Sequence, residues 1–246
     1  MNTHDNSLKN NTSKFDGERV IEGKTPIRIW LDHVCRYNLA CDYAIDKVVL
    51  DIACGTGYGS YILRGAGAKK VVGMDTSIET IEFAKNKYQS RELEFKVGNI
   101  LYIDFPESSF EVITCFETIE HVQNQNKALE ELKRVLKPDG LLIISSPNRK
   151  LTSPCKSLHE QPDNLFHTIE YTANEFNSVL NDHFKVLNIY GQRGISKLWL
   201  LKVVEILTRK LVPSIYDPER GSPELKLMSS FKEYRYITVV CKKLGL

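Results

Sequence analysis

The sequence carries almost no net charge, because 33 Lys and Arg residues are offset by 31 Asp and Glu residues, a balance of +2. A near-neutral chain lacks the broad positive field that holds proteins on the phosphate backbone of nucleic acids. We therefore expect no DNA partner, and an RNA partner is disfavoured. Hydrophobic residues make up 42% of the chain and charged residues 26%, which excludes a wholly disordered or fibrous protein.

Paired cysteines and long apolar runs are also absent. The six cysteines form no C-x-x-C pair, so neither a zinc ribbon nor a thioredoxin-type redox site is indicated. The first 18 residues are polar and contain no apolar core of a secretory signal, so we expect a cytoplasmic protein. The longest apolar stretch, 198–207, contains Lys202 and Glu205 and is too short for a membrane span of about 20 apolar residues.

From Lys47 onward, apolar runs of strand length alternate with helical patterns. This alternation is typical of repeated β-α units over a parallel sheet. We predict an α/β fold with a Rossmann-like, doubly wound sheet of seven strands, mostly parallel, with an antiparallel last strand. The predicted strands are 47–52, 70–74, 93–97, 111–116, 141–145, 184–190 and 234–241.

The length of 246 residues suits one large domain. We expect a disordered polar N-terminus over 1–18 and a single domain over 19–246. Two segments outside the alternation, 147–172 and 191–232, are expected to face the substrate. The apolar pattern at 198–211 predicts a helix that serves as a lid, the face of a homodimer or a membrane-surface helix.

A glycine loop follows the first predicted strand, in the order Gly55-Thr56-Gly57-Tyr58-Gly59. Glycines at such a turn permit positive φ and let a ligand approach the backbone, while the next helix start favours a negative group. Asp75 ends the second predicted strand, where its carboxylate can accept both hydroxyls of a ribose. These features predict a ribose-containing cofactor.

Two cofactor classes fit a glycine loop followed by an acid. Dinucleotide binding favours G-x-G-x-x-G, whereas this loop has G-x-G-x-G with Asp51 four positions before Gly55. An acid there repels a pyrophosphate and attracts an α-ammonium group. The pattern resembles motif I of class I S-adenosylmethionine-dependent methyltransferases. An NAD(P)-dependent oxidoreductase is kept as the alternative.

The resemblance implies roles for residues along the chain. Asp51 would face the methionine end of S-adenosylmethionine, the glycines would cover it, and Asp75 would hold the ribose. Asn99 stands where the family has an Asp that reaches the adenine amino group, and an amide oxygen can accept the same hydrogen bond. The implied cofactor-binding set is Asp51, Gly55, Gly57, Gly59, Asp75, Thr76, Asn99, Ile100, Phe116 and Arg36.

Acidic and histidine side chains are dense after the fourth predicted strand. If residues 117–121 form a helical turn, Glu117, Glu120 and His121 share one face. His167 precedes a helix that Thr172 can cap. The sequence E-x-x-E-H followed by H-x-x-E resembles two metal-dependent branches, the ubiquinone-pathway O-methyltransferases and the enzymes that methylate the 3′-terminal ribose of small RNAs.

That resemblance implies a divalent cation, Mg²⁺, Mn²⁺ or Zn²⁺, bound by Glu117, Glu120, His121 and His167. The alternative is a metal-free site in which His121 is a general base beside Glu120. Under either reading we expect a methyltransferase that O-methylates a small hydroxylated metabolite, a sugar or a phenolic compound. Methylation of the 3′-terminal ribose of RNA is the first alternative.

Overall fold

The computed structural model describes residues 20–196, 222–230 and 232–244. The predicted polar N-terminus and the predicted helix at 198–211 lie outside these residues. Among the described helices, none combines the length and the apolar character needed to cross a membrane.

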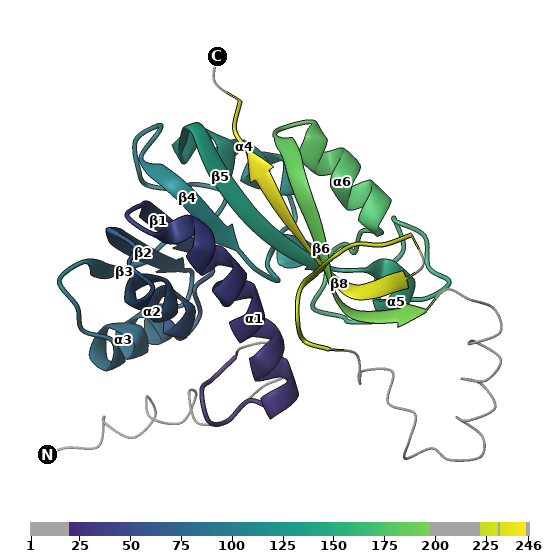
Figure 1. Cartoon of the computed structure of the whole chain (residues 1–246), viewed down its shortest axis with the longest axis horizontal. Coiled ribbons are helices and arrows are strands. Elements are labelled where there is room, and N and C mark those ends of the chain that lie inside the picture. The colour runs from purple at the N-terminus through teal and green to yellow at the C-terminus, as the bar shows by residue number, and fades with distance from the viewer. Residues whose placement is uncertain (1–19, 197–221, 231, 245–246) are drawn as a thin grey trace, which may run out of the picture.

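One sheet of eight strands forms the centre of the molecule, in the order β3-β2-β1-β4-β5-β8-β6-β7 (Figure 1). β1 to β5 pair in parallel, and β8 pairs antiparallel with both β5 and β6. The strands are β1 Val48–Ile52, β2 Lys70–Asp75, β3 Leu93–Val97, β4 Phe110–Cys115, β5 Leu136–Pro147, β6 Lys185–Ser196, β7 Lys226–Leu227 and β8 Lys232–Lys242. The predicted topology is confirmed. The count of seven strands is too low, because β7 is only two residues long and has no strand pattern of its own.

Helices cover both faces of the sheet, as expected for a doubly wound fold. They are α1 Ile27–Ala44, α2 Tyr58–Gly65, α3 Ile78–Lys87, the 3-10 helix η1 Ile119–His121, α4 Gln125–Val135, α5 Arg149–Thr152 and α6 Ala173–Asn181. Successive strand residues point to opposite faces, so Val49 packs with α1, α2 and α3 while Leu50 packs with α4 and α6. Two buried clusters therefore hold the sheet from its two sides.

The helix cap predicted at Thr172 is confirmed, and Ser77 caps a second helix. The Ser77 side chain accepts a hydrogen bond from the backbone of Thr80, and Thr172 forms a capping box with Glu175. Residues 137–140 lie within the bounds of β5, but pairing with β4 passes from Leu136 directly to Leu141. The ladder with β4 is therefore irregular there, while the Asp139 N–H and the Gly140 carbonyl oxygen bond to the backbone of Lys243.

Buried polar contacts attach α1 to β6, close to one edge of the sheet. The Asp32 carboxylate accepts a hydrogen bond from Arg193 at 2.9 Å, and the Arg36 guanidinium donates to Gln192 at 2.7 Å. The four side chains that make these two hydrogen bonds are almost fully buried. These bonds join the N-terminal helix to β6 and so fix the helix over the strand ends.

Candidate active site

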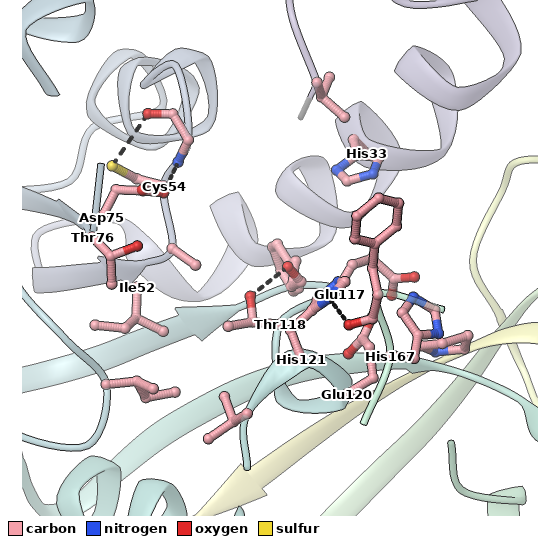
Figure 2. A pocket seen from close by; sticks show the side chains of 18 of the residues that line it. His33, Ile52, Cys54, Asp75, Thr76, Glu117, Thr118, Glu120, His121 and His167 are labelled. Carbon is pink, nitrogen blue, oxygen red and sulfur yellow. Dashed lines mark hydrogen bonds between the residues drawn. The ribbon is translucent and has the colours of Figure 1, made fainter. Parts of the chain in front are cut away.

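A cavity of about 980 Å³ opens at the carboxyl ends of the parallel strands, where ligands bind in open α/β sheets. Figure 2 shows its two ends. Cys54, Asp75 and Thr76 lie at one end, and Glu117, Glu120, His121 and His167 lie at the other. His33 projects from α1 near the second group. The cavity therefore has a polar strand-end region and a separate region rich in acids and histidines.

The loop after β1 has a left-handed backbone at alternate residues. Ala53 has φ 56°, Gly55 has φ 54° and Gly57 has φ 84°, a conformation that costs little for glycine and more for alanine. Gly55 and Ala53 line the cavity, whereas Gly57 and Gly59 do not. Gly59 lies inside α2, where an added Cβ would come within 1.9 Å of the Tyr37 ring. Its role is close packing of α2 against α1.

Asp51 lies beneath this loop and does not line the cavity. Its buried carboxylate accepts hydrogen bonds from the hydroxyls of Ser60 at 2.6 Å, Thr114 at 2.7 Å and Tyr37 at 3.1 Å. Burial raises the pKa of Asp51 to about 6, against the opposing effect of these donors. Tyr37 does line the cavity, so Asp51 acts on the cavity wall through the ring that it holds.

Asp75 lines the cavity at the end of β2. One carboxylate oxygen accepts from the Gly55 backbone N–H at 3.0 Å and the other from the Ser77 N–H at 3.0 Å, so its orientation is fixed. Asn99 also lines the cavity, and its side-chain oxygen accepts from the Leu101 N–H at 2.9 Å. The other lining residues of the predicted cofactor set are Thr76, Ile100 and Phe116.

Arg36 is the remaining member of the predicted set, and it lies outside the lining. The side chain is 1% exposed, stacks over the Tyr236 ring at 5.1 Å and lies 3.8 Å from a Glu117 oxygen. The cavity face of α1 is formed instead by His33 and Tyr37. Arg36 therefore joins α1 to Glu117 and to the sheet rather than facing the cavity.

Glu120, His121 and His167 form a group that we call the acid-histidine cluster. One ligand-type atom from each lies within 4.8 Å of the others, and the two imidazole centroids are 4.8 Å apart. The Glu120 side chain is buried, and its Oε2 has no hydrogen-bond partner among the residues that the structure describes. Burial, followed by the charge of Glu117, raises the pKa of Glu120 well above its usual range.

Glu117 stands apart from the cluster, so the predicted helical turn over 117–121 is wrong at its first residue. The 3-10 helix covers only Ile119–His121, and Glu117 has a left-handed backbone with φ 47°. Ser145 holds it there, because its hydroxyl accepts from the Glu117 N–H at 3.0 Å and donates to the carboxylate at 2.6 Å. Three of the four predicted metal ligands therefore come together.

The imidazoles of the cluster are oriented by neighbouring groups. His167 Nδ1 lies 2.6 Å from a Glu170 carboxylate oxygen, and its Nε2 lies 2.9 Å from the Asn164 amide. His121 Nδ1 lies 3.1 Å from the Phe166 carbonyl oxygen. A carboxylate that fixes a histidine in this way is common behind metal-binding histidines.

The pattern His33-x-x-Arg36-Tyr37 resembles an N-terminal element that closes over the cofactor in some family members, but sequence patterns did not reveal the part of the wall made by Arg235 and Tyr236. The spacing of Ile29, His33 and Tyr37, four residues apart on one helix face, was the available signal for α1. For β8 the sequence held no such signal, because the strands that pair with β8 are set by the order of the sheet.

The predicted substrate-facing segment 147–172 does contribute to the lining, with Pro147, Thr152, Asn164, Phe166, His167 and Glu170. Of the segment 191–232, no described residue lines it.

Comparisons with known proteins agree with this geometry. A family model described as a methyltransferase domain matches residues 45–198. A probable S-adenosylmethionine-dependent methyltransferase of Mycolicibacterium smegmatis is 30% identical over 203 residues, covering 80% of this chain and 76% of that protein. The PH0226 protein of Pyrococcus horikoshii superposes with a TM-score of 0.63 at 19% identity, covering 93% and 96% of the two chains.

More partial matches include a ubiquinone biosynthesis O-methyltransferase of Glaesserella parasuis. It is 37% identical over 110 residues, which cover 42% of this chain and 46% of that protein. A further methyltransferase relative, from Mycobacterium tuberculosis, is 31% identical over 68% of this chain and 59% of its own length. The chain thus spans less than two thirds of the length of several relatives that it matches.

Proposed function

The chain belongs to the class I S-adenosylmethionine-dependent methyltransferases, and from this premise we propose that it O-methylates a small molecule with two neighbouring hydroxyl groups. In the proposed reaction a divalent cation binds the acceptor at the acid-histidine cluster. The O-methyltransferase named among the relatives supports oxygen as the methylated atom. The observation that carries the proposal is the unpartnered, buried Glu120 oxygen beside two imidazoles.

The strand-end region of the cavity suits S-adenosylmethionine, which supplies the methyl group on a sulfonium. Asp75 is held by two backbone N–H groups, so its remaining lone pairs are available to ribose hydroxyls. The left-handed backbone at Gly55 lets the ligand approach the chain closely. Ile100 and Phe116 offer apolar surface beside it. These residues bind and orient the cofactor and contribute through positioning.

The acid-histidine cluster suits a divalent cation of the mixed oxygen and nitrogen type. Glu120, His121 and His167 would hold it, with His167 binding through Nε2 once the Asn164 amide moves away from it. Glu117 becomes a fourth ligand if its bond to Ser145 is released. Imidazole ligands favour the later transition metals. When bound, such a cation lowers the pKa of a hydroxyl on the acceptor. Glu170 would keep the His167 ring in place.

Metal removal tests the proposal. We expect dialysis against a chelator to lower catechol methylation at least 100-fold and added Mn²⁺ to restore it. Glu120→Gln and His167→Ala should each weaken Mn²⁺ binding, measured by titration calorimetry, at least tenfold. His159→Ala is the matched control, because this exposed histidine lies in the same segment and outside the cavity lining.

Three outcomes contradict the proposal. They are full turnover by a metal-free preparation, methylation of an amine rather than a hydroxyl, and transfer to RNA without transfer to any small diol. In the first case His121 takes the general-base role. The methylated atom is identified by mass spectrometry of the product.

A further inference from the structure

Three imidazoles line the cavity, those of His33, His121 and His167. The present inference rests on the proposed function, in which the last two are metal ligands. An imidazole whose free lone pair binds a cation cannot accept a proton. Methyl transfer to a hydroxyl nevertheless requires that its proton leave, and so the reaction needs another base.

The carboxylates that line the cavity are engaged elsewhere. Glu117 accepts from Ser145 and faces Arg36. Glu170 is buried and accepts from Thr152 and Ser153 besides facing His167. Asp75 lies at the strand-end region, away from the cluster (Figure 2). Glu120 belongs to the cluster itself.

The His33 imidazole differs from all of these groups, because no hydrogen bond joins its ring to any of the residues that the structure describes. It projects from the cavity face of α1 and lies near the acid-histidine end in Figure 2. Tyr37, one turn further along the helix, contacts Phe116 with ring centroids 5.0 Å apart. A four-residue step along a helix is about 6 Å, so His33 and Tyr37 line neighbouring parts of the same cavity wall.

The environment of His33 keeps its ring unprotonated but also makes it a weak base, which a bound cation would offset by lowering the pKa of the acceptor hydroxyl. Burial, together with the positive charge of Arg36, lowers the pKa of His33 well below its usual range. The ring is therefore neutral at neutral pH, and one ring nitrogen carries a free lone pair. Of the titratable side chains in the described cavity wall, His33 alone combines a neutral basic nitrogen with a position outside the cluster.

We propose that His33 is the general base that takes the proton of the acceptor hydroxyl during methyl transfer. As the acceptor oxygen forms its bond to the methyl carbon, the sulfur–carbon bond breaks and its electron pair stays on sulfur. The hydroxyl proton passes to the His33 ring and then to water. The products are the methyl ether, S-adenosylhomocysteine and a proton, so atoms and charge balance.

Two acceptors of different acidity test the assignment. With catechol, whose hydroxyls are protonated at neutral pH, we expect His33→Gln to lower kcat at least 100-fold. With 4-nitrocatechol, which is already ionised at neutral pH, the same variant should lose less than fivefold, because no proton has to be removed. The glutamine amide retains a hydrogen-bond acceptor, so catechol affinity in the presence of S-adenosylhomocysteine, measured by calorimetry, should change less than fivefold.

Asn38→Gln is the matched control, since Asn38 is exposed on the same helix and outside the cavity lining, and it should leave both reactions unchanged. Equal losses of kcat on the two catechols would overturn the general-base role while leaving the proposed function intact. A loss of S-adenosylhomocysteine affinity in His33→Gln would overturn it also, because His33 would then belong to the cofactor region. If wild-type enzyme methylates neither catechol, both proposals fall.

Discussion

At the residue scale, two non-glycine residues with a left-handed backbone lie in the cavity wall, one at each end of the cavity. Ala53 adopts the left-handed conformation beside Gly55, and Glu117 adopts it after β4. Non-glycine residues in this region cost about 1–3 kcal/mol and persist where the surroundings hold them. At Glu117 the two hydrogen bonds of Ser145 supply that constraint. At these two positions the strained backbone belongs to residues that line the cavity.

Asp51 yields a prediction about pH. Its pKa is about 6 in the folded state and near 3.8, the ordinary value for aspartate, in the unfolded state, so the folded state keeps the proton to higher pH. The free energy of unfolding of the wild type should therefore fall as pH rises from about 4 to 6. Asp51→Asn lacks this titration, and at 1.36 kcal/mol per pKa unit its stability relative to wild type should improve by about 3 kcal/mol.

Urea unfolding of both proteins at pH 4, 5, 6 and 7 measures this difference. The comparison removes the contribution of other titrating groups, which the two proteins share. A constant offset between the two curves is expected as well, because an amide satisfies the three hydroxyl donors less well than a carboxylate. A difference that stays flat over this pH range, or that changes in the opposite direction, contradicts the raised pKa.

At the element scale, sequence patterns predicted the parts whose structure depends on near neighbours. The strands are continuous apolar runs, α3 begins at its Ser77 cap, and Asp75 follows directly from the end of β2. The pattern failed where tertiary contacts decide the backbone. Glu117 leaves the expected helical turn because Ser145 of β5 holds it. Tyr236 lines the cavity because β8 inserts between β5 and β6, which residue spacing does not encode.

The contact between α1 and α2 gives a prediction about Gly59. An alanine Cβ there would lie 1.9 Å from the Tyr37 ring, which is buried and hydrogen-bonded to Asp51. The ring cannot withdraw without breaking that bond, so we expect Gly59→Ala to destabilise the fold by about 3 kcal/mol. Gly65→Ala, on the same helix and with nothing within 4 Å, should instead be neutral or stabilising by up to about 1 kcal/mol.

Thermal unfolding of the two variants distinguishes packing from ligand contact. The packing role requires Gly59→Ala to lower Tm in the absence of any ligand. If Gly59→Ala keeps the wild-type Tm and loses only S-adenosylhomocysteine affinity, the residue belongs to the cofactor loop as the sequence pattern indicated, and the packing role is wrong.

At the scale of the whole molecule, the cavity joins parts that are distant in sequence. Its wall takes residues from α1, from the loops after β1 to β5, and from β8. α1 itself is attached through Asp32 and Arg36 to β6. A ligand that fills the cavity therefore contacts segments that are far apart in the sequence, and its binding should stabilise the fold as a unit.

This coupling predicts how ligands change thermal stability. A ligand at 100 times its dissociation constant adds about 2.7 kcal/mol to the free energy of unfolding, which corresponds to a Tm increase of about 5–10 °C for a chain of this size. We expect S-adenosylhomocysteine to give this shift and NAD(H) to give none, because the Asp51 carboxylate beneath the loop disfavours a pyrophosphate. Asp75→Asn should reduce the shift by weakening the ribose contacts, whereas Asp104→Asn, outside the cavity lining, should not. A shift with NADH that S-adenosylhomocysteine does not reproduce would contradict the cofactor assignment even though the fold is shared by both ligand classes.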